Sequence, residues 1–102
     1  DEAIGEFQLA AKAPAFLVDC CSLLGACFQE KGFPDLAIKW FERGLEAPEV
    51  SESESLGLLY ELGNLYLVTG ERDVARKTFG EIYGVNSNYR DVVAKLEELK
   101  VH

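Results

Sequence analysis

The fold is decided by residues 24–41, LGACFQEKGFPDLAIKWF, and by their altered repetition at residues 62–79, LGNLYLVTGERDVARKTF. At a constant offset of 38 positions, a Leu-Gly pair, an aromatic residue, a second glycine, an alanine and a phenylalanine recur in the same order. The paired positions are Leu24 and Leu62, Gly25 and Gly63, Phe28 and Tyr66, Gly32 and Gly70, Ala37 and Ala75, and Phe41 and Phe79. Such a register indicates an internal repeat, in which each unit buries its apolar face against a neighbour.

A second repetition extends the pattern toward the N-terminus. Ala37, Ile38, Phe41 and Gly44 align at offset 34 with Ala3, Ile4, Phe7 and Ala10. The difference of four positions between the two offsets falls in the connection between Glu46 and Ser55. The repeat therefore covers most of the chain.

Along the chain, apolar residues also recur three or four positions apart, which is the spacing of amphipathic helices. No segment alternates strictly with period two, so the sequence predicts an all-α chain. We expect six helices, near residues 1–12, 15–31, 34–46, 53–69, 71–84 and 88–100.

The expected helix ends have characteristic residues. Gly32 and Gly70 are suited to close helices in the left-handed conformation. Ser51 with Glu54 fits a capping box, with Ser53 as an alternative start, and Asn88 is expected to cap the last helix. Gly25 and Gly63 lie mid-helix, where glycine costs about 1 kcal/mol relative to alanine; this is tolerable where a neighbouring helix must approach closely.

Composition excludes several classes of protein. The 102 residues include 10 basic and 18 acidic ones, a net charge of −8, which argues against a nucleic-acid or anionic-membrane surface. No apolar stretch approaches the roughly 20 residues that span a bilayer, and no signal peptide is visible. The absence of methionine leads us to expect a piece of a longer protein, and we expect a cytoplasmic location.

The residues of catalytic and metal sites are scarce. His102 is the only histidine, so no base–nucleophile pair is expected, and we predict neither an enzyme nor a cofactor. Cys20, Cys21 and Cys27 lie in an apolar setting that favours buried packing. A redox or metal role is the alternative, but a structural zinc site needs four ligands and no fourth is evident.

The repeated pattern resembles the tetratricopeptide repeat family, in the Leu-Gly-x-x-aromatic, Gly and Ala-x-x-x-Phe positions and in segments such as residues 33–38 and 64–66. The resemblance implies an antiparallel helix-pair solenoid in a bacterial protein. It places the second helix of a truncated repeat at residues 1–13, full repeats at 18–51 and 56–87, and a capping helix at 88–102.

The resemblance also implies a concave peptide-binding groove lined by the first helix of each repeat. Carried over residue by residue, the ligand-facing positions are Asp19, Ser22, Ala26, Gln29 and Glu30 in one repeat, and Gly57, Tyr60, Asn64, Leu67 and Val68 in the next. Asn64 matches an asparagine that holds a ligand backbone. Ser22 and Tyr60 replace the lysines of a carboxylate clamp, so a neutral, basic or apolar segment is the expected ligand.

Three functions remain open. The first is a protein-binding adaptor in bacterial assembly, secretion or signalling machinery, and the second is a structural spacer or self-association segment with open apolar ends. The third is an enzyme, which would require a catalytic domain elsewhere in the parent protein. The acidic run from Glu46 to Glu61 fits a solvated loop and helix start, or an attachment surface for a basic partner. Trp40 is expected either to be partly buried between repeats or to serve as an exposed anchor for a partner.

Overall fold

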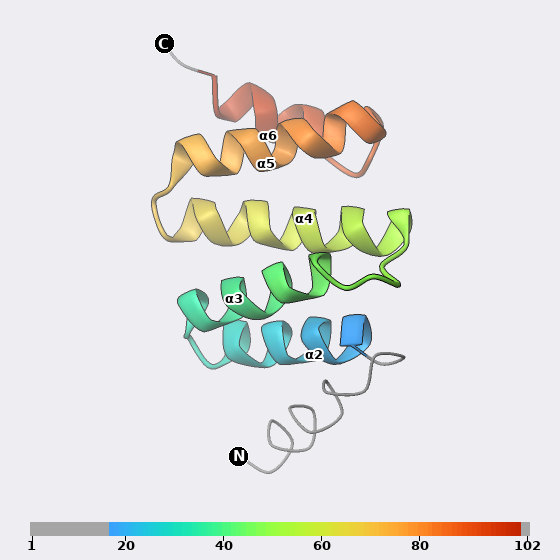
Figure 1. The fold of residues 1–102 in the computed structure, drawn as a ribbon. Coiled ribbons are helices and arrows are strands. Elements are labelled where there is room, and N and C mark those ends of the chain that lie inside the picture. Colours follow the sequence, from blue (N-terminus) through green and yellow to red (C-terminus); the bar gives the residue numbers. More distant parts are fainter. Residues whose placement is uncertain (1–16, 101–102) are drawn as a thin grey trace. The chain divides into compact units, whose positions relative to one another are not determined.

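The computed structural model describes residues 17–100, in which every regular element is an α-helix (Figure 1). The helices are α2 (Leu17–Glu30), α3 (Pro34–Leu45), α4 (Glu52–Val68), α5 (Arg72–Val85) and α6 (Val92–Glu98). The chain divides into two compact units, residues 1–58 and 59–102, and the division falls inside α4. The expected all-α class is confirmed, while the helix expected at residues 1–12 lies outside the described residues.

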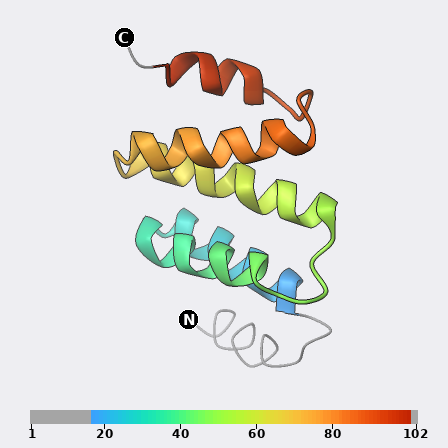
Figure 2. The ribbon, with the colours of Figure 1, turned by 45° about the horizontal axis from the view of Figure 1, so that its top comes forward.

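In the first unit, α2 and α3 form an antiparallel pair joined by a short turn (Figures 1 and 2). Leu24 of α2 and Phe41 of α3 are buried between them. A Cβ atom added to Gly25 would lie 2.6 Å from Cε1 of Phe41. Only a glycine leaves room for this ring, so the close approach expected at Gly25 is confirmed.

The second unit repeats this contact between α4 and α5. A Cβ atom added to Gly63 would lie 2.5 Å from Cζ of Phe79, whose side chain is fully buried. Ile82 of α5 and Val92 of α6 complete the buried layer, and α6 packs beside α5. The same two residue types, 38 positions apart, therefore set the same helix contact in each unit.

The turns that follow α2 and α4 are also alike. Gly32 and Gly70 both have φ of +84°, the left-handed conformation expected of them. The Phe33 amide donates to the Phe28 carbonyl over 2.9 Å, and the Glu71 amide donates to the Tyr66 carbonyl over 2.8 Å. These are the hydrogen bonds of a Schellman motif, which satisfies the last carbonyls of a helix while reversing the chain.

The start of α4 confirms the predicted capping box. The Glu54 amide donates to Oγ of Ser51 over 3.1 Å, and the Ser51 amide donates to Oε1 of Glu54 over 3.0 Å. The helix begins at Glu52, so Ser51 is the cap and the alternative start at Ser53 is wrong.

The prediction for the last helix was wrong in its length and its cap. Asn88 lies in a turn, where its amide donates to Oδ1 of Asn86 over 3.0 Å, and α6 begins only at Val92. Arg90 has φ of +42°, so the chain cannot continue as a regular helix through it. Residues 88–91, which the sequence pattern assigned to the helix, therefore belong to the chain reversal that precedes α6.

The glycine–phenylalanine contact generates the first testable prediction. Gly63→Ala places a methyl group against the buried Phe79 ring, and overpacking of this kind costs about 1–3 kcal/mol, which outweighs the gain in helix propensity. We expect the free energy of unfolding to fall when measured by urea denaturation.

Gly80→Ala in α5 is the matched control for this variant. A Cβ atom at Gly80 meets nothing within 4 Å, so this variant is expected to gain about 1 kcal/mol from propensity alone. Equal stability changes in the two variants would contradict the packing argument.

Candidate functional site

The residues predicted on α2 share one exposed face in the first unit. Asp19, Ala26, Gln29 and Glu30 are exposed and Ser22 is half-buried. Spacings of three, four and one positions bring them within one side of a helix, away from the buried Leu24. The face carries two carboxylates and no basic residue among these five positions, which gives it a negative potential.

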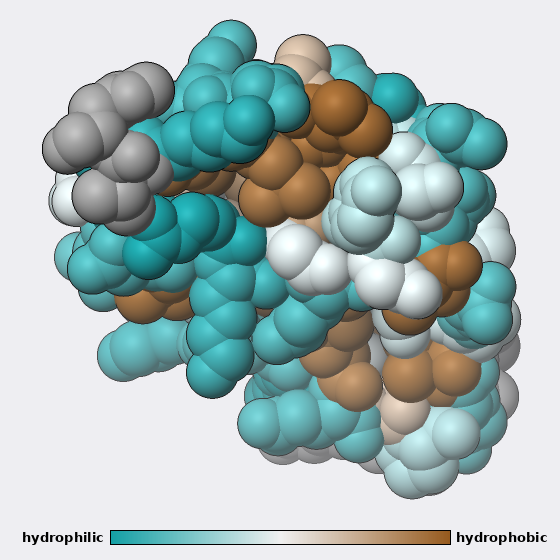
Figure 3. Space-filling view, turned by 90° about the horizontal axis from the view of Figure 1, so that it is seen from above, coloured by the Kyte–Doolittle hydropathy of each residue, from teal (hydrophilic) through white to brown (hydrophobic). Residues whose placement is uncertain are grey.

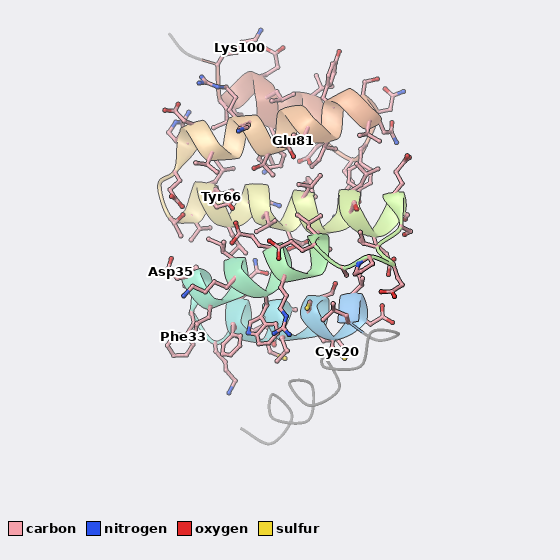
Figure 4. The ribbon with its side chains drawn as sticks, in the orientation of Figure 1. Cys20, Phe33, Asp35, Tyr66, Glu81 and Lys100 are labelled. Carbon is pink, nitrogen blue, oxygen red and sulfur yellow. The ribbon has the colours of Figure 1, made fainter. Side chains whose placement is uncertain are left out.

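Two exposed apolar side chains of the same unit escaped the sequence prediction. Leu23 is 47% exposed and lies beside Asp19 and Ala26 on α2. Phe33, at the start of α3, is 53% exposed and points away from the helix pair (Figure 4). The available signal for Leu23 was its position outside the buried stripe, and it supplies the apolar contact that the predicted α2 set lacked.

The residues predicted on α4 divide between the two units. Gly57 belongs to residues 1–58, whereas Tyr60, Asn64, Leu67 and Val68 belong to residues 59–102. Tyr60, Asn64 and Leu67 are half-buried, and Val68 is 74% exposed. Each of these predicted residues is therefore at least partly exposed within its own unit.

Tyr60 is the centre of a side-chain cluster that the sequence did not indicate. Its hydroxyl donates a hydrogen bond to Oδ1 of Asp91, which is 31 positions further along the chain. Its ring meets Phe79 and Tyr89 edge-on, with centroids 5.9 and 6.1 Å away. The Arg90 guanidinium lies over the rings of Tyr60 and Tyr89, 4.8 and 5.1 Å from their centroids. These contacts attach the α5–α6 connection to α4.

The hydrogen bond moves the pKa values of its two partners in opposite directions. Donation to Asp91 is the largest cause that raises the pKa of Tyr60, and burial adds to it, while the Asn64 side chain and Arg90 act in the opposite sense. Acceptance from Tyr60 is the largest cause that lowers the pKa of Asp91. Both pKa values move further from pH 7, so at neutral pH Tyr60 remains a protonated phenol and Asp91 remains a carboxylate. This combination suits structural support rather than proton transfer.

The packing prediction is confirmed for two of the three cysteines. Cys20 and Cys21 are buried and Cys27 is half-buried, and all three are free thiols. Burial raises the pKa of the Cys21 thiol, so a smaller fraction of this thiol is present as the reactive thiolate. Within residues 17–100, no three His, Cys, Asp or Glu side chains gather in a way that could hold a metal ion.

Comparison of the chain with protein-family models and with curated proteins gives no match. Across residues 17–100, none of the helices has the length and apolar character needed to cross a bilayer.

The Tyr60–Asp91 hydrogen bond is tested by Tyr60→Phe, which keeps the ring contacts and removes the donor. We expect the pKa of Asp91 to rise toward its ordinary value of 3.8, as measured by NMR titration of its carboxyl carbon. Tyr83→Phe, at an exposed tyrosine of α5, is the control and is expected to leave Asp91 unchanged. An Asp91 titration that is identical in the wild type and Tyr60→Phe would refute the assigned hydrogen bond.

The same pair also sets the sign of a pH dependence. Because the pKa of Asp91 is lower in the folded chain, its contribution to stability is present above 3.8 and is lost as pH falls through the lowered value. Because the pKa of Tyr60 is raised, its contribution is present below 10.0 and is lost as pH rises through the raised value. Urea denaturation across pH is expected to show both losses in the wild type and weaker ones in Tyr60→Phe.

Proposed function

We propose that the chain is a protein-interaction module of the tetratricopeptide type, which binds a peptide or helix of a partner protein on the exposed faces of its first helices. The observation that carries the proposal is the repeated glycine–phenylalanine contact, at Gly25 with Phe41 and at Gly63 with Phe79. In each case the two partners stand on either side of a turn with a left-handed glycine. Repetition of one helix pair is the organisation from which extended binding surfaces are built.

The face of α2 has the chemistry of a peptide-binding surface. Leu23 offers an apolar contact, Gln29 offers both donors and acceptors, and Asp19 and Glu30 supply negative charge. A basic or neutral peptide with at least one apolar side chain complements this combination. Because a regular helix already fixes the backbone and the spacing of these side chains, docking orders the side chains alone and costs less entropy than docking on a disordered segment.

The face of α4 contributes in the same way within its own unit. Asn64 is proposed to hold the ligand backbone, and Leu67 with the exposed Val68 to supply apolar contact. Tyr60 already uses its hydroxyl on Asp91, so its share in binding is limited to the ring edge. The role of Tyr60 is therefore to support the surface as much as to contact the ligand.

The second candidate function is a structural spacer or self-association segment. The observation in its favour is the set of apolar side chains that remain exposed on α5 and α6 of the second unit, namely Val74, Tyr83, Val85 and Val93. Figure 3 shows hydrophobic atoms exposed among hydrophilic ones on the side of the molecule that carries α6. Such residues suit contact with a further copy of the chain.

A displayed library of random peptides, selected on the intact chain, tests the first function against the second. We expect enrichment of peptides that share basic and apolar positions, and we expect Leu23→Ala and Asn64→Ala each to weaken their binding by roughly tenfold, as for a residue near the centre of an interface. Glu81→Ala, on the exposed surface of α5 (Figure 4), is the matched control and is expected to bind normally.

Sedimentation of the same protein over a range of concentrations completes the comparison. Absence of any enriched peptide, together with reversible association as concentration rises, would reject the peptide-binding function in favour of self-association. A monomer that enriches a peptide family supports the proposal.

A further inference from the structure

A hollow of about 230 Å³ lies on α3 and is lined by Leu36, Lys39, Trp40 and Arg43. Leu36 and Trp40 are one helical turn apart and form an apolar row, and Lys39 and Arg43 form a basic row beside it. Leu36 is 40% exposed and Trp40 is half-buried. The Arg43 guanidinium lies 5.1 Å from the centroid of the Trp40 ring, so the indole face and the charge adjoin.

The charge of this hollow is opposite to that of the chain. The protein has a net charge of −8, yet the hollow is lined by two cations and no carboxylate. Asp35 and Glu42 belong to the same helix but do not line it. In the range 17–100, neither Lys39 nor Arg43 forms an ion pair with a carboxylate. The lining of this hollow therefore combines an apolar surface with positive charge, a combination that complements an acidic ligand with an apolar side chain.

We propose that this hollow binds an acidic segment of a partner protein that carries an apolar anchor. A leucine or aromatic side chain of the partner packs between Leu36 and Trp40, and flanking carboxylates pair with Lys39 and Arg43. Arginine presents paired N–H donors that match a carboxylate, and Trp and Arg are the residue types on which interface energy concentrates. The partner chemistry is opposite in charge to that expected on the face of α2, so this inference goes beyond the proposed function.

Trp40 makes the proposal directly measurable because it is the only tryptophan in the chain. The probe is a capped synthetic peptide in which one leucine and one phenylalanine are flanked by glutamates. Titration of this peptide into the intact protein is expected to shift the Trp40 emission to shorter wavelength, since binding removes the indole from water. The same peptide with lysines in place of the glutamates is expected to give no shift.

Three variants separate charge pairing from nonspecific contact. Lys39→Gln combined with Arg43→Gln is expected to weaken the glutamate peptide by roughly fivefold to tenfold, the effect of two exposed ion pairs. Lys77→Gln, an exposed cation of α5 in the second unit, is expected to leave binding unchanged. Leu36→Ser tests whether the apolar row contributes to binding. Far-ultraviolet circular dichroism verifies that each variant folds.

The outcomes that overturn the proposal are distinct. An equal shift with the lysine peptide, or unchanged binding in the folded double variant, would show that charge complementarity does not direct binding. An emission shift that depends on the concentration of the protein alone would assign the hollow to a second copy of the chain. Absence of any shift up to millimolar peptide would also reject the partner proposed here.

Discussion

The contact between a glycine backbone and a phenylalanine ring is the constraint on which the rest of this structure depends. In each unit the ring from the second helix lies so close to the first that a Cβ atom would be 2.6 Å from Phe41 at Gly25, or 2.5 Å from Phe79 at Gly63. Protein interiors are packed so densely that an added Cβ atom at either glycine would displace the phenylalanine ring or the helix that carries it. The separation and register of the two helices follow from this contact. The glycine turn that precedes each second helix is long enough to allow this separation and this register.

Local and periodic features were predictable because their causes lie within a few residues. The capping box at Ser51 and Glu54 and the left-handed glycines at Gly32 and Gly70 depend on hydrogen bonds between near neighbours in the chain. The buried stripes depend on helical spacing alone. The close approach of a helix at Gly25 and Gly63 was also predictable, because a mid-helix glycine is unfavourable unless a neighbour occupies the space that its missing side chain leaves. That the neighbour is a phenylalanine ring was not predicted.

What sequence reasoning missed is of longer range. Tyr60 and Asp91 are separated by 31 positions, and nothing local distinguishes Asp91 from an ordinary residue of a helix start. Asp91 precedes α6 but makes no side-chain hydrogen bond to its first turn. The Tyr60 hydroxyl uses this carboxylate instead, and the reversal containing Arg90 shortens the helix. On the face of α2, spacing determined which residues share a side. The same spacing places Leu23 outside the buried stripe, but the set carried over from the resemblance did not include it.

The same packing explains how an acidic chain presents surfaces of different charge. In an antiparallel pair, α2 and α3 each bury one side against the other, so their remaining sides form separate surfaces whose residues are not constrained by a common core. Asp19 and Glu30 lie on one of these surfaces, and Lys39 and Arg43 on the other. Net charge governs long-range attraction, but the Debye length of about 10 Å at 0.1 M ionic strength leaves the choice of partner to nearby residues. A helix-pair unit can therefore present two chemically unlike surfaces without altering the contact that holds it together.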